Sequence, residues 1–325
     1  MQPTLTLAAG LAMLAGAAAA QPGMTQVETV SGPGVVDKTT QTEDIGFKTD
    51  RTERMTVPVV VSGTGPYRFL VDTGADRTAV SRQLANRLKF AAAESASLHS
   101  VSGVSTVTTA TVPTLKLTRN EIRNINAPLL ESEDMGADGI LGTDSLRAQR
   151  VLFDFEANSL SIVPSAVPDF RVEPGTIVIQ GARRNGRLVV TEATANGRPL
   201  TVVIDTGSQV SIGNEALKKS LLRAKVLSAA EPVELISVTG DKIMGDYMFV
   251  RELEIGGVTL RNLAIVFANA HSFKQMRLDS KPALLLGMNA MRSFKKVSID
   301  FASRKMRVVV PEHSALDNKL AARLR

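Results

Sequence analysis

The tripeptide Asp-Thr-Gly occurs twice, at residues 72–74 and 205–207, and each copy ends a run of apolar residues. A strand that is apolar throughout is buried on both faces, so each aspartate would lie at the floor of a cleft, where a lone charge is costly. Two carboxylates in contact share one proton, because both cannot ionise easily. One carboxylate can then act as general base on a water molecule while the other donates a proton to a carbonyl oxygen. Such a pair could hydrolyse an amide.

Further segments around the two copies match each other in the same order. The separation only grows along the chain, from 133 residues (205 − 72) to 146 residues (297 − 151), as expected for two copies of one unit with a few loop insertions. We therefore predict two homologous lobes, residues 51–168 and residues 169–312. The other matching segments are 100–103 with 237–240, 122–124 with 260–262, 139–142 with 284–287, and 151–155 with 297–301.

Short runs rich in β-branched residues, separated by turn signals, predict strands in both lobes. The turn signals include residues 62–66 and the pair Asn196-Gly197, which favours a tight hairpin. Short helices are expected from about Ser81 to Lys89 and after Asn214, a residue suited to capping a helix. The fold class is therefore mainly β with minor helix.

Composition excludes several classes of chemistry. The chain has 325 residues, 44% of them hydrophobic and 22% charged, which fits a packed globular protein. It lacks Cys, and its three histidines (His99, His271 and His313) form no metal motif. There is no serine-hydrolase, P-loop or dinucleotide motif. The net charge of +6 fits solvated surface residues better than a nucleic-acid or membrane footprint. We expect no cofactor, no metal and no nucleic-acid partner.

The first 20 residues carry no charged side chain and end in three alanines before Gln21. This pattern predicts a cleaved signal peptide over residues 1–20, with an uncleaved anchor as the alternative. A secreted or periplasmic location follows. Residues 21–50 are predicted to be a flexible lead-in, and residues 313–325 a short basic tail.

The motifs resemble those of the aspartic proteases, in particular the retropepsin-like branch. Residues 70–76 (Leu-Val-Asp-Thr-Gly-Ala-Asp) are similar to the retroviral active-site strand, and residues 203–208 (Val-Ile-Asp-Thr-Gly-Ser) to its Ser form. Gly142 and Gly287, each after apolar residues, match the second landmark of that family. The resemblance covers roughly residues 55–310. It implies a bilobal acid-protease fold, with two β-barrel-like lobes, pseudo-twofold symmetry and short helices.

The resemblance also implies roles for individual residues. Asp72 and Asp205 would be catalytic, and Thr73 and Thr206 would interlock the two active loops through hydroxyl–backbone bonds. Gly74 and Gly207 would offer backbone groups to substrate. Two hairpin tips would close over an extended peptide as flaps, although neither has the tyrosine of pepsin. The flap residues are Val101, Ser102 and Gly103 in one copy and Val238, Thr239 and Gly240 in the other; Ala75, Ser208, Gly142 and Gly287 would support the active loops.

Several acidic and polar residues have more than one interpretation. Ser208 could bond Asp205 or cap a turn, and Asp76 could pair with an arginine or be solvated. Asp154 and Asp300 recur at equivalent places before a Phe and are expected to fix turns. The acidic run 131–138 lacks the ligand alternation of an EF-hand and is expected to form an exposed loop.

The sequence thus predicts an aspartic endopeptidase acting on peptide or protein substrates. Its two lobes would form one active site, so a monomer would be functional. One alternative is an enzyme whose chains pair to build the site. The other is a catalytically silent peptide-binding module of the same fold.

Overall fold

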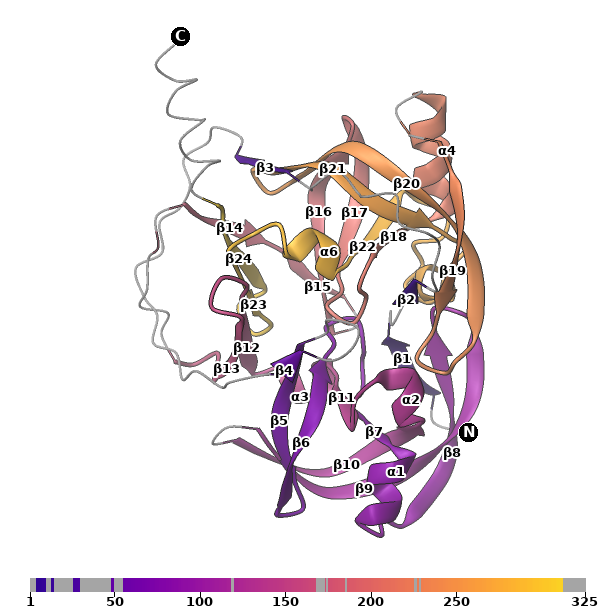
Figure 1. The fold of residues 1–325 in the computed structure, drawn as a ribbon, viewed down its shortest axis with the longest axis vertical. Helices are drawn as coiled ribbons and strands as arrows, with labels where there is room; N and C mark the ends of the chain where they lie inside the picture. The colour runs from indigo at the N-terminus through magenta and orange to yellow at the C-terminus, as the bar shows by residue number, and fades with distance from the viewer. Residues whose placement is uncertain are drawn as a thin grey trace.

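The computed structural model describes residues 55–117, 120–167, 173, 175–184, 186–224, 227 and 229–311, and the backbone of four short strands before them. These residues form two lobes, each built on one large sheet, and a third sheet to which both lobes contribute. Figure 1 shows the lobes one above the other, with the shared sheet at one side. The prediction of a mainly β, bilobal fold is confirmed.

The sheet of the first lobe, the N-lobe, has the strand order β1-β8-β9-β10-β7-β11-β6-β5-β4. Its strands are β1 (Thr4–Ala9), β4 (Lys48–Thr49), β5 (Met55–Val61), β6 (Thr64–Val71), β7 (Ala79–Ser81), β8 (Ala92–Ser100), β9 (Val104–Leu117), β10 (Asn120–Leu130) and β11 (Gly139–Leu141).

The sheet of the second lobe, the C-lobe, has the order β15-β16-β17-β22-β18-β21-β20-β19-β2, and β3 pairs with β21. Its strands are β2 (Met13–Leu14), β3 (Gln26–Thr29), β15 (Ala182–Arg184), β16 (Arg187–Ala195), β17 (Arg198–Ile204), β18 (Ser211–Gly213), β19 (Glu231–Ile236), β20 (Lys242–Ile255), β21 (Val258–Phe267) and β22 (Ala283–Leu286).

The two halves of the sequence repeat have the same strand topology. The order β8-β9-β10-β7-β11-β6-β5 in the N-lobe corresponds strand for strand to β19-β20-β21-β18-β22-β17-β16 in the C-lobe. Asn196 and Gly197 have φ values of 46° and 73°, as the predicted tight hairpin requires. The equivalent N-lobe hairpin turns at Ser62 and Gly63, so β6 begins at Thr64, earlier than the turn signal suggested.

Short helices connect the strands. The two helices predicted from the sequence are present, and each follows a residue that caps it: Asn214, as predicted, and Ser81, for which no cap was predicted. Ser81 accepts a hydrogen bond from the backbone of Leu84 at 3.0 Å, and Asn214 accepts one from Leu217 at 2.8 Å. The helices are α1 (Arg82–Arg87), α2 (Ser132–Met135), α3 (Thr143–Leu146), α4 (Glu215–Arg223), α5 (His271–Gln275) and α6 (Met288–Met291).

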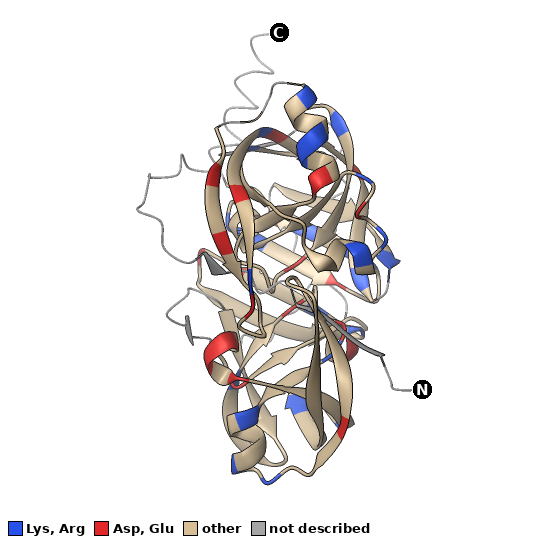
Figure 2. Cartoon of the chain, turned by 90° about the vertical axis from the view of Figure 1, so that its right-hand side faces the viewer, with Lys and Arg blue, Asp and Glu red and all other residues tan. Residues whose placement is uncertain are grey.

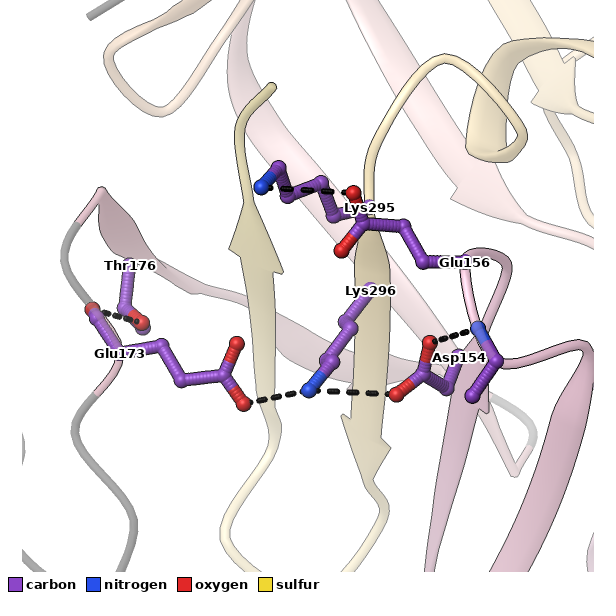
Figure 3. Close-up of polar contacts among 7 residues, drawn as sticks. Asp154, Glu156, Glu173, Thr176, Lys295 and Lys296 are labelled. Atoms are coloured by element: carbon purple, nitrogen blue, oxygen red, sulfur yellow. Dashed lines mark hydrogen bonds and ion pairs between the residues drawn. The ribbon is translucent and has the colours of Figure 1, made fainter. Parts of the chain in front are cut away.

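The shared sheet, with the order β13-β12-β23-β24-β14, joins the lobes. Asp154 and Asp300 hold turns beside it, as predicted, by accepting hydrogen bonds from the backbones of Ala157 (2.8 Å) and Ser303 (2.9 Å). In Figure 3 the ammonium of Lys296 lies between two carboxylates, 3.1 Å from Asp154 and 2.5 Å from Glu173. The strands are β12 (Gln149–Asp154), β13 (Ser159–Pro164), β14 (Thr176–Gln180), β23 (Lys296–Asp300) and β24 (Lys305–Val309).

Acidic and basic residues are interspersed along the chain of both lobes in the view of Figure 2. None of the described helices has the length and apolar character needed to cross a membrane. The predicted tail, residues 313–325, lies outside the described residues. Of the predicted signal peptide and lead-in, only strands β1 to β4 are described.

Candidate active site

The two aspartates follow directly after equivalent strands. Asp72 comes after β6 and Asp205 after β17, and their exposed fractions are 0% and 1%. The backbone N–H of Asp72 donates to Leu141 and that of Asp205 to Leu286, each at 3.0 Å. Each aspartate is therefore held at the end of a central, fully paired strand.

Gly142 and Gly287, the second landmarks, pass directly behind the active loops. A Cβ at Gly142 would overlap the backbone of Arg77, and a Cβ at Gly287 would overlap that of Val210. Their N–H groups donate to hydroxyls of Thr78 (3.2 Å) and Ser211 (3.1 Å). Only a residue without a side chain fits at either place.

Thr73 and Thr206 interlock the two active loops across the lobe interface. Thr73 Oγ1 donates to the carbonyl of Ile204 at 2.8 Å, and Thr206 Oγ1 donates to that of Val71 at 2.7 Å. Each hydroxyl also accepts the N–H of the other threonine, at 3.1 and 3.0 Å. All these groups are buried, so the four bonds fix one loop against the other.

This interlock brings the two carboxyl groups together. A Cβ on Gly74 would be 2.5 Å from Asp205 Oδ1, and a Cβ on Gly207 would overlap the carboxyl of Asp72. Each carboxyl thus packs on the glycine of the opposite loop. Asp72 Oδ1 accepts the N–H groups of Gly74 (2.8 Å) and Ala75 (3.0 Å), and Asp205 Oδ1 accepts that of Gly207 (3.1 Å). Among the described residues, Asp72 Oδ2 has no hydrogen-bond partner.

The electrostatic environment differs between the two carboxyls. Burial, and then the facing charge of Asp205, raise the pKa of Asp72 well above its usual value. Burial also raises the pKa of Asp205, to about 6, against the opposing effect of the Arg187 guanidinium. The pair therefore holds a proton at pH values where an exposed aspartate holds none.

Arg187 is a site residue that sequence reasoning missed. It begins β16 in the C-lobe, is 1% exposed, and reaches the N-lobe loop. Its Nε donates to the Gly74 carbonyl at 2.8 Å, and its Nη2 lies 2.9 Å from Asp76 Oδ1. Asp76 thus pairs with an arginine, one of its two interpretations. Asp76 indicated that an arginine could lie near the site, but the sequence alone does not identify which arginine it is.

Ser208 caps a turn and makes no side-chain bond to the aspartate. Its hydroxyl donates to the carbonyl of Val210 at 2.7 Å. Its backbone N–H instead contributes to lowering the pKa of Asp205. Of the two interpretations left open by the sequence, the structure therefore agrees with the turn.

The two predicted flap tips lie at the β8–β9 and β19–β20 hairpins and meet each other. Ser102 Oγ donates to Ser237 Oγ at 3.1 Å. Val101 and Val238 are fully buried, each in the apolar cluster of the opposite lobe: Val101 packs with residues of the C-lobe and Val238 with residues of the N-lobe. Each flap tip thus crosses the lobe interface.

The acidic run 131–138 is not the exposed loop expected from its charges. It contains α2, and Met135 and Ala137 are 0% and 3% exposed. The expectation was wrong because these two apolar residues pack in the cluster that receives Val238. Among the described residues, no group of three or more potential ligands could hold a metal ion.

The outer edge strand of each flap pairs with a further extended segment. Strand β1 pairs in parallel with β8 at Ser97, Leu98 and Ser100, and β2 pairs antiparallel with β19 at Leu235 and Ile236. A single extended segment that crosses a twofold-related pair of strands must be parallel to one and antiparallel to the other. The flap edges have that arrangement.

Two lobes of one topology, each giving one Asp-Thr-Gly loop to a common buried centre, define an aspartic protease fold. Residues 57–148 match the family of gag-polyprotein putative aspartyl proteases, and residues 191–290 match the aspartyl protease family. The chain thus carries two aspartyl protease domains in tandem and is a two-lobed member of the retropepsin-like aspartic proteases. No curated protein matches the chain.

Proposed function

We propose that this protein is an aspartic endopeptidase that hydrolyses peptide bonds with a water molecule activated between Asp72 and Asp205. The observation that carries the proposal is the pair of buried carboxyls, each packed on the glycine of the opposite loop by the threonine interlock. Burying two adjacent carboxyls is costly, and a silent peptide-binding module gains nothing from it.

Burial raises the pKa of both carboxyls, and the charge of Arg187 opposes the rise at both. The pair therefore shares one proton, so that one carboxyl is the acid and the other the base. The steps below are written with the proton on Asp72 and the charge on Asp205.

In the first step Asp205 takes a proton from water while the water oxygen bonds to the substrate carbonyl carbon. Asp72 gives its proton to the carbonyl oxygen, which leaves a neutral tetrahedral diol. In the second step the C–N bond breaks and the amine nitrogen takes the proton from Asp205. Asp72 recovers a proton from one hydroxyl as the new carboxylic acid forms. The dyad returns to its starting state.

Substrate would bind as an extended strand beneath the flaps. The pairing of β1 with β8 and of β2 with β19 supports this mode, because in both flaps the outer edge pairs with an extended strand. Since one chain supplies both loops, a monomer suffices. The apolar residues 1–20 support secretion or export to the periplasm, with a mature chain beginning at Gln21 as the expected product.

The test is cleavage of a peptide library by the purified protein and by Asp72→Asn and Asp205→Asn variants. Each substitution should reduce cleavage by about a hundredfold to ten-thousandfold while the fold is kept. Asp154→Asn is a matched control, because Asp154 holds a turn outside the site. Full activity in either dyad variant would refute the mechanism.

Two measurements separate the alternatives. Cleavage rate should be linear in protein concentration, whereas a quadratic dependence would indicate sites shared between chains. A statine-type peptide, whose hydroxyl mimics the diol, should inhibit cleavage. If such a peptide bound tightly but no peptide were ever cleaved, the protein would be a binding module.

A further inference from the structure

The flap of the N-lobe is docked on one short helix of the C-lobe. We define the N-flap as residues 96–106, with its tip at residues 101–103. The side chain of Val101 is buried in a cluster that contains Ala270 and Phe273, at the start of α5. The backbone N–H of His271 donates to the carbonyl of Val101 at 2.8 Å.

A histidine pair completes this contact. His99 lies on β8, two residues before Val101, and its Nδ1 is 2.8 Å from Nε2 of His271. The two rings are stacked, with centroids 5.1 Å apart and planes inclined by 23°. Both side chains are partly buried. One ring nitrogen must donate and the other accept, so the contact requires at least one neutral ring.

We propose that His99 and His271 are positioning residues that hold the N-flap over the dyad, and that their protonation releases it. The functional part of this inference rests on the proposed proteolysis; the docking itself does not. Two positive rings at hydrogen-bond distance would repel each other, and neither nitrogen could accept.

Burial of the pair is the main cause that favours the neutral form. Burial lowers the pKa of His99, and burial, His99 and Lys274 lower that of His271. Among the described residues, neither ring has an ion pair with a carboxylate. On the facing flap, Asp241 accepts from Ser102 at 3.5 Å.

The sign of the effect follows from linkage. A histidine whose pKa is lowered by docking binds its proton more weakly in the docked state than in the released state. Docking is therefore favoured above the ordinary histidine pKa of about 6.5 and is weakened as the pH falls below it. Each unit of lowering changes the ratio of docked to released flap by about tenfold per proton.

The absence of Cys allows a direct measurement. Val104, beside the tip, is 54% exposed, and Ser280, in the C-lobe, is also exposed. Nitroxide labels on a Val104→Cys/Ser280→Cys chain report the distance between flap and lobe by pulsed electron paramagnetic resonance. Between pH 8 and pH 5 we expect the docked distance to lose population and a second, released distance to gain it.

The comparison variant is His99→Asn/His271→Gln, in which amide groups replace the two bonding nitrogens without titrating. We expect its distance distribution to be the same at both pH values, and His271→Gln alone to have a reduced response. His313→Gln changes the chain's third histidine and should respond like the parent. A response that persists in the double variant, or a parent that does not respond, would overturn the proposal.

The pH dependence of KM is a second measurement, and a contact with only a structural role would not change it. In the parent, KM should fall from pH 8 to pH 5 as the flap opens to peptide, and this fall should vanish in the double variant. The pH dependence of kcat, set by the dyad, should be common to both. The labelled chain can also carry Asp72→Asn. If that chain still releases its flap in acid, the docking proposal holds even where the proposed protease function fails.

Discussion

The interlock between the two active loops can be tested by Thr206→Val, which removes one hydroxyl at nearly constant side-chain volume. That hydroxyl donates to the carbonyl of Val71 at 2.7 Å and accepts the N–H of Thr73 at 3.1 Å. Valine would leave both backbone groups buried without a partner. Each stranded group costs about 1–3 kcal/mol, so the variant should lose roughly 2–6 kcal/mol of unfolding free energy.

A loss of this size is a large part of the stability of an ordinary protein, about 5–15 kcal/mol. It should lower the thermal midpoint by at least about 4 °C and reduce cleavage, because Asp205 precedes Thr206 directly. Unfolding by heat and by denaturant, together with peptide cleavage, measures both effects. Thr206→Ser keeps the hydroxyl and should stay close to the parent. A valine variant within about 0.5 kcal/mol of the parent and fully active would refute this account of the interlock.

Three further changes test other parts of the site. Arg187 lowers the pKa of both dyad carboxyls, so Arg187→Gln combined with Asp76→Asn should move the pH–rate profile to higher pH, whereas Arg187→Lys, which keeps the charge, should not. Gly207→Ala should abolish cleavage of a model peptide, since its Cβ would overlap the carboxyl of Asp72; wild-type turnover would contradict the close packing. Asn214→Ala should cost about 1–3 kcal/mol in denaturant unfolding, because Asn214 caps α4 and also donates to two backbone carbonyls at 2.7 and 2.6 Å. Asn214→Ser keeps a capping oxygen without placing a charge against the two carbonyls and should lose less, and equal losses would show that the cap contributes nothing.

The sequence repeat and the two candidate catalytic aspartates could be predicted, because both can be recognised from short stretches of sequence. Apolar runs ending in Asp-Thr-Gly, and landmarks in the same order in both halves, need no knowledge of tertiary contacts. The capping role of Asn214 could also be predicted, since a helix cap bonds a residue three positions away.

Other features depend on partners that are distant in sequence. Arg187 lies 113 residues from Gly74, to which it donates, and nothing local distinguishes it from other arginines. The acidic run 131–138 is charged, yet two of its residues are buried because the tip of the second flap packs on them. Ion pairs and burial between residues so far apart in the sequence depend on how the two lobes pack against each other.

The amino-acid sequence by itself determined a mainly β fold with two equivalent strands, each of which ends in one aspartate. Only the tertiary structure decided that the carboxyls meet, that the charge of Arg187 acts on both of them, and that His99 faces His271 across the lobes. The physical reason is range: periodicity and capping act over a few residues, whereas the electrostatics of a buried pair depend on every group that folding brings within a few ångströms.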